Sequence, residues 1–230
     1  MTDHPILFSG EMVRAILAGR KTQTRRIINP QPASWASVFQ PAPVETPGGS
    51  YGKQGQWVQS SADGHHMHGM RRFPYGQVGD RLWVKETWQA IKQDTNGISY
   101  TLADPADETA EIRYRATDET FVPPLPWRPS IYMRRRMSRI TLEVTEIRVE
   151  RLQDISEEDA IAEGIENIAR NQTMPPWPDY RNAPDQWHEI PGFDRPVHSY
   201  RSLWESINGP GSWDANPWVW VVGFKMLIPV

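Results

Sequence analysis

The sequence has 230 residues, no cysteine and a formal net charge of −3 at pH 7. The lack of cysteine excludes disulfides, thiol nucleophiles and cysteine-based zinc sites. No stretch approaches the roughly 18 apolar residues of a membrane-spanning helix, and residues 1–10 lack the basic and apolar regions of a secretory signal. We therefore expect a cytoplasmic protein without a membrane partner, in which any nucleic acid must bind through a local basic patch.

The first predicted element is a short helix over residues 9–19. Ser9 is a suitable N-cap, and apolar residues between positions 12 and 17 form one stripe at helical spacing. Gly19 stands where a residue of left-handed conformation often ends a helix. The chain then turns sharply into a basic stretch from Arg20 to Arg26.

Two stretches interrupt the regular pattern. Residues 29–76 are rich in proline and glycine, and residues 170–196 are rich in proline and tryptophan. The first stretch predicts an irregular excursion with at most one hairpin. We interpret its cluster of His65, His66 and His68 as a surface loop and expect no metal. Both stretches are interpreted as insertions in a single domain that spans residues 1–230.

The remaining sequence predicts short strands and two more helices. Alternating apolar residues predict strands at 82–88, 98–103, 111–115, 140–149 and 218–226. A change of phase within 140–149 predicts a β-bulge near Thr145–Glu146. A capping box at Ser156 predicts a helix that ends at Gly164, and a helical apolar repeat predicts another at 200–207. Short strands with peripheral helices indicate an α+β fold built on a mixed, mainly antiparallel β-barrel.

The stretch Gly19-x-Lys21-x-x-Thr24-x-Arg26 is the most informative part of the sequence. It resembles the GxKxxTxR motif of the ASCH superfamily, a branch of the PUA-like β-barrels. Residues 79–86 resemble the second block of that family. Residues 138–140 and 216–220 resemble its longer, phage-type members, and the matching blocks together cover about half of the chain. The resemblance implies a PUA-like barrel whose working site surrounds the motif.

The same resemblance implies two kinds of activity. Members of the superfamily are proposed to bind RNA, and some small bacterial members resemble amidohydrolases that remove the acyl group from N4-acetylcytidine. In those members a lysine and a threonine of the motif and a glutamate of the following block are catalytic. The matching positions here are Lys21, Thr24 and Glu86. We expect no cofactor.

The chemistry of these residue types fits a catalytic role. A threonine hydroxyl is a weak nucleophile until a base removes its proton, and lysine is a base only when burial or a nearby cation lowers its pKa. Arg25 and Arg26 are suitable neighbouring cations for Lys21. Glu86 shares a predicted strand face with apolar residues, where a carboxyl group needs a partner or must stay protonated. If Glu86 is instead an ion-pair partner, the site binds without catalysing.

Two classes of function stay open at this stage. As a binding module, the domain would hold RNA or a nucleoside at the motif and through an arginine run at 134–139. The candidate binding residues are Gly19, Arg25, Arg26, Arg135 and Arg139. As an enzyme, the domain would cleave an acyl group from a cytosine nucleoside or would cut RNA. The sequence does not determine the oligomeric state.

Overall fold

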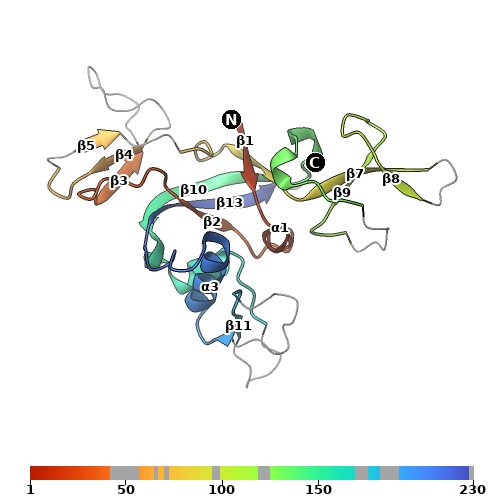
Figure 1. Cartoon of the computed structure of the whole chain (residues 1–230). Helices are drawn as coiled ribbons and strands as arrows, with labels where there is room; N and C mark the ends of the chain where they lie inside the picture. The colour runs from red at the N-terminus through yellow and green to blue at the C-terminus, as the bar shows by residue number, and fades with distance from the viewer. Residues whose placement is uncertain are drawn as a thin grey trace, which may run out of the picture.

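The structure, a computed structural model, is centred on one five-stranded sheet (Figure 1). It describes residues 1–41, 57–64, 67–69, 73–94, 99–118, 125–168, 176–181 and 192–227. The central strands, in spatial order, are β1 (Asp3–Leu7), β6 (Arg81–Lys85), β10 (Thr141–Arg151), β13 (Trp218–Leu227) and β2 (Gln23–Ile27). Only the β1–β6 pair is parallel among these neighbours, and the two edge strands β1 and β2 are consecutive in the chain.

Helix α1 (Gly10–Leu17) joins these two edge strands. The Ser9 side chain accepts a hydrogen bond from the backbone N–H of Met12, and Gly19 has a φ of 72° just beyond the helix. Val13 and Ile16 are buried in the main core. The predicted N-terminal helix, its cap and its glycine stop are therefore confirmed.

The two longest strands, β10 and β13, pair in the middle of the sheet and are strongly curved (Figure 1). Their register shifts between Val144 and Glu146, which confirms the predicted bulge. The predicted strand 82–88 is only partly correct. β6 ends at Lys85, and β7 (Trp88–Gln93) pairs instead in a separate sheet with β8 (Tyr100–Leu102) and β9 (Glu111–Tyr114).

The first insertion contains more structure than the sequence predicted. β3 (Val38–Pro41), β4 (Trp57–Ser60) and β5 (Met67–Gly69) form an antiparallel three-stranded sheet, so the expectation of at most a hairpin is wrong. Trp57 packs edge-on against Trp220 of β13, with ring centroids 5.2 Å apart, and this contact ties the insertion to the main core. Figure 1 shows the β3–β5 and β7–β9 sheets projecting from opposite ends of the central sheet.

The C-terminal half adds a helical layer on one side of the sheet (Figure 1). It contains α2 (Glu157–Ala162) and α3 (Pro196–Asn208), together with the two-residue strands β11 (Trp177–Pro178) and β12 (Gly192–Phe193). The Ser156 side chain caps α2, and Gly164 has a φ of 98°, as the capping pattern predicted. Tyr200 and Trp204 of α3 pack in a second core against Val221 of β13.

The architecture is α+β, but the described strands do not close into the predicted barrel. The edges of β1 and β2 share no backbone ladder in the described part of the chain. Instead, the Arg26 side chain crosses between them and donates from Nη2 to the Leu7 carbonyl oxygen at 2.6 Å. β1 and β2 are thus connected by α1 and by this side-chain hydrogen bond, and not by backbone hydrogen bonds between the two strands. Among the helices that the structure describes, none has both the length and the apolar character needed to cross a bilayer.

Candidate functional site

Lys21 lies just after α1, and its side chain has no exposed surface. Its Nζ donates to Glu163 Oε2 at 2.8 Å and to the Glu163 main-chain oxygen at 2.7 Å. Burial lowers the pKa of Lys21, although the charge and hydrogen bond of Glu163 oppose this shift; Arg26 and Arg25 add to it. The lowered pKa makes Lys21 easier to deprotonate than a lysine in water, which is the direction that a general base requires.

Gly164 allows the turn after α2 to approach Lys21 closely. Its φ of 98° is a conformation that residues with a side chain rarely adopt. A Cβ atom added there would lie 3.0 Å from the Cβ atoms of both Lys21 and Ala15. The glycine that stops α2 thus also brings Glu163 within reach of the lysine.

Arg25 is held by carboxylates on both terminal nitrogens. Nη1 donates to Glu163 Oε1 at 3.3 Å, and Nη2 donates to Asp159 Oδ2 at 2.8 Å and Glu150 Oε2 at 3.1 Å. Arg148 also donates to Asp159 Oδ2, at 2.8 Å. The charge of Arg25 is therefore balanced inside the protein, and its hydrogen bond to Glu163 helps to hold that side chain in place.

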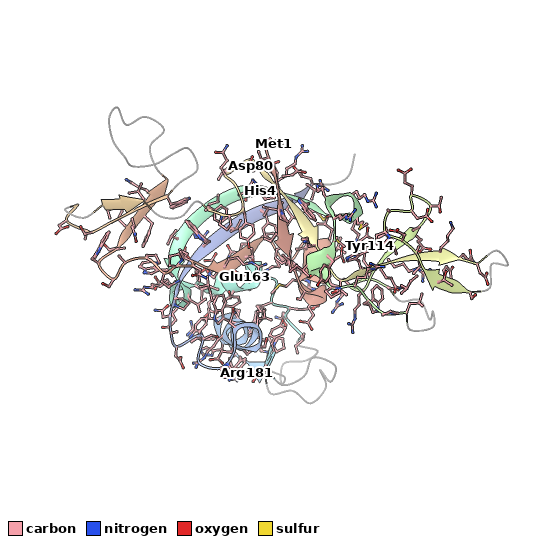
Figure 2. All side chains as sticks on the ribbon, turned by 45° about the horizontal axis from the view of Figure 1, so that its top comes forward. Met1, His4, Asp80, Tyr114, Glu163 and Arg181 are labelled. Carbon is pink, nitrogen blue, oxygen red and sulfur yellow. The ribbon has the colours of Figure 1, made fainter. Side chains whose placement is uncertain are left out.

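Glu163 is the residue on which the motif converges, and sequence reasoning missed it. Its side chain is 4% exposed and accepts hydrogen bonds from both Lys21 and Arg25. In Figure 2, Glu163 is labelled between the central sheet and α3. The one sequence signal was its position at the end of a capped helix, directly before Gly164, and nothing local linked that position to Lys21.

A cavity of about 140 Å³ lies beside this cluster, at the free edge of β2. Thr24, Arg26 and Glu163 line it together with Tyr200 and Trp204 of α3. The volume corresponds to roughly five water molecules at about 30 Å³ each, and it is below the roughly 300–1,000 Å³ of drug-sized pockets. The cavity therefore fits a single small polar group or ring more readily than a polymer.

Three side chains that line this cavity carry a buried N–H group with no hydrogen-bond partner among the described residues. These groups are Arg25 Nε, Arg26 Nε and Trp204 Nε1. An unpaired buried donor is costly, so each such group in a folded protein requires an explanation. The three side chains share the lining of one cavity, but the N–H groups themselves have almost no accessible surface, so an acceptor of a ligand would reach them only after a side-chain movement.

Arg26 and Lys21 share an aromatic neighbour. The Arg26 guanidinium lies 5.3 Å from the centroid of the Phe8 ring, and Lys21 Nζ lies 5.7 Å from it. The Phe8 backbone N–H donates to the Lys85 carbonyl oxygen at 3.2 Å, next to Glu86. Phe8 thus stands between the motif and the end of β6.

Glu86 belongs to a different ion pair. It is 1% exposed and is held by Arg139 in a two-point contact, with Nε to Oε1 and Nη2 to Oε2 both at 2.9 Å. The same guanidinium lies 4.1 Å from the Tyr114 ring centroid, and Figure 2 places Tyr114 toward the β7–β9 sheet, apart from Glu163. The structure therefore brings Lys21 and Thr24 to Glu163, and it pairs Glu86 with Arg139.

The other candidate residues occupy structural positions. Gly19 is the left-handed residue after α1. Arg135 bonds to Asp3 Oδ2 at 3.0 Å and lies in the short turn η2 (Arg135–Met137). Of the histidine cluster, residues 65 and 66 and the side chain of His68 lie outside what the structure describes. Groups of three or more metal-binding side chains are absent from the described residues.

The cluster around Glu163 is close to neutral, since its three carboxylates, Glu163, Asp159 and Glu150, face three cations, Lys21, Arg25 and Arg148. A phosphate group would compete with these internal carboxylates. A neutral ligand with acceptor atoms would instead meet the aromatic walls and, after a side-chain movement, the unpaired donors. Comparison of the chain with protein-family models, with curated proteins and with solved structures finds no match to any of them.

Proposed function

We propose that this chain is an ASCH-type, PUA-like domain that binds a nucleoside, free or within RNA, at the cavity beside Glu163. The observation that carries the proposal is that three side chains with a buried, unpaired N–H group, Arg25, Arg26 and Trp204, all line that one cavity. A pyrimidine base presents carbonyl and ring-nitrogen acceptors, which suit such donors, and it has a flat face that packs on aromatic side chains. The basic motif resembles that of ASCH domains, which agrees with this ligand class.

The near-neutral cluster favours recognition of the base over the phosphate backbone. Lys21 and Arg25 are both buried and paired with carboxylates, so neither is available to neutralise phosphates at the surface. Binding through phosphates is strongly weakened by salt, because each contact releases counterions. Binding through the base is therefore expected to depend little on salt.

The test is a calorimetric titration of the purified protein with cytidine and with N4-acetylcytidine. Thr24→Val removes a hydroxyl group from the cavity lining while nearly preserving shape, and it is expected to weaken binding by about two- to tenfold, the usual worth of one hydrogen bond. Thr22→Val makes the same change at an exposed neighbour outside the lining and serves as the matched control. Equal affinities in both variants, or no binding by the parent, would contradict the proposal.

Hydrolysis of an acylated nucleoside is the second candidate function, and the lowered pKa of Lys21 favours it. In that reaction Lys21 would take the proton of Thr24, the Thr24 oxygen would attack the acyl carbon, and the amine would leave with a proton. Water would then release the acyl group from threonine. The carboxylate beside Lys21 is Glu163, so we assign the positioning role to Glu163 in preference to Glu86, and Lys21 would pass the proton taken from Thr24 to the leaving amine.

Release of cytidine from N4-acetylcytidine tests this candidate. If the reaction occurs, Glu163→Gln is expected to reduce kcat strongly, whereas Glu86→Gln is expected to act mainly on stability. The reverse order would restore Glu86 to the catalytic set. Absence of any release by a parent protein that binds the nucleoside would leave binding as the function.

A further inference from the structure

A second cavity, of about 440 Å³, lies at the base of the β7–β9 sheet. Its walls come from Trp88 at the start of β7, from the turn at 104–106 after β8, and from Arg128, Tyr132 and Arg134. The volume lies within the roughly 300–1,000 Å³ range of pockets that hold drug-sized ligands. None of these residues lines the cavity beside Glu163.

The walls of this second cavity are held by backbone contacts. Trp88 and Arg128 exchange two backbone hydrogen bonds, of 3.2 and 2.8 Å. The Arg136 side chain donates to the carbonyl oxygen of Pro105, which fixes the turn against η2. The cavity is thus framed by hydrogen-bonded main chain on two sides.

Unpaired donors distinguish the second cavity. Trp88 is 1% exposed, and its indole N–H has no partner among the described residues but almost no accessible surface either, so the donors that a ligand would meet are those of the arginines. Among the residues that the structure describes, the guanidinium groups of Arg128 and Arg134, which line this cavity, form no ion pair with a carboxylate. The one acidic residue of the lining, Asp104, accepts a hydrogen bond from the backbone N–H of Ala106 at 2.7 Å.

We propose that this cavity binds an organic phosphate of mononucleotide size. A phosphate group offers several acceptor oxygens and matches the planar donor arrangement of two guanidinium groups. Tyr132 is 71% exposed and lines the cavity, so its ring is available to stack on the organic part of the ligand. The contrast with the cavity beside Glu163 is one of charge, because there the cations already face internal carboxylates.

The test is calorimetric titration with cytidine 5′-monophosphate, with cytidine and inorganic phosphate as reference ligands. Arg134→Gln removes an exposed charge that folding does not require, and it is expected to raise the Kd for the nucleotide by about tenfold or more, as loss of a charged hydrogen bond does. Arg135→Gln is the matched control, because Arg135 is the adjacent arginine, bonds to Asp3 and lies outside the lining. It is expected to leave the Kd within about twofold.

Three results would overturn the proposal. They are equal weakening by Arg134→Gln and Arg135→Gln, equal affinity for inorganic phosphate and the nucleotide, and no binding by the parent. A nucleotide whose affinity falls in Thr24→Val and not in Arg134→Gln would occupy the cavity beside Glu163 instead. The same comparison separates the two sites, since cytidine binding is expected to respond to Thr24→Val alone.

Discussion

Replacing Glu163 with glutamine is the most direct test of the buried cluster. Glu163 is 4% exposed and the Lys21 side chain has no exposed surface, so the substitution leaves an ammonium group in the interior without its carboxylate. Breaking one side of a buried ion pair costs about 3–5 kcal/mol. Lys21 keeps the Glu163 main-chain oxygen at 2.7 Å and Arg25 keeps two other carboxylates, so we expect the lower end, about 3 kcal/mol.

Urea unfolding followed by tryptophan fluorescence measures this loss, and the chain has 11 tryptophans. A change of about 3 kcal/mol corresponds to roughly 6–12 °C in Tm for a chain of this size. Glu166→Gln is the matched control. Glu166 pairs with Arg20 at 3.3 Å, but the two side chains are 55% and 36% exposed, so we expect a change within about 0.5 kcal/mol.

A second substitution and a pH series make the test specific. Lys21→Met in the Glu163→Gln background removes the orphaned cation and is expected to recover part of the lost stability. Because folding lowers the pKa of Lys21, the unfolded chain binds that proton more tightly, and stability rises as the pH increases toward 10.5. The difference in the free energy of unfolding between the parent and Glu163→Gln is therefore expected to become smaller as the pH increases toward 10.5. A loss below about 1 kcal/mol, or no recovery with Lys21→Met, would refute the reasoning.

Three further outcomes are expected, each checked by urea unfolding. Gly164→Ala is expected to cost about 1–3 kcal/mol, because the residue has positive φ and its Cβ would lie 3.0 Å from that of Lys21; an unchanged midpoint would contradict this close packing. Arg139→Met strands the buried Glu86 carboxylate and is expected to cost about 3 kcal/mol, and equal stability would mean that water replaces the guanidinium. Burial acts to raise the pKa of Asp159, but its two arginine partners lower it below 3.8. The stability that Asp159 contributes is thus present above pH 3.8 and is lost as the pH falls through its lower pKa in the folded protein. The stability of Asp159→Asn is therefore expected to fall less steeply with acid than that of the parent. An equally steep fall would contradict this role of Asp159.

The features that the sequence predicted correctly depend on short-range chemistry. The caps of α1 and α2 and the positive φ of Gly19 follow from residues within one helical turn. The bulge in β10 follows from a change of phase in neighbouring apolar residues. Such signals are complete within a few residues, so tertiary structure did not change them.

The features that the sequence did not predict depend on distant partners. Lys21 and Glu163 are 142 positions apart, and Glu86 and Arg139 are 53 apart, so no local pattern joins either pair. The resemblance grouped Lys21 with Glu86. In the structure the carboxylate that pairs with Lys21 is Glu163, which follows α2, and Glu86 pairs with Arg139. The strands of the β3–β5 sheet were missed because proline and glycine dominate the sequence around them, while their stability comes partly from Trp57 against Trp220.

The separation of Lys21 and Glu163 along the chain also sets the order in which the cavity beside them is completed during synthesis. Chains emerge from the N-terminus at about 5–20 residues per second, so the motif is exposed long before α2 exists. The cavity further needs Tyr200 and Trp204, which belong to α3 and follow Glu163 by about 40 residues. A nascent or truncated chain that stops before α3 therefore has the whole motif but lacks the wall of the cavity that α3 supplies.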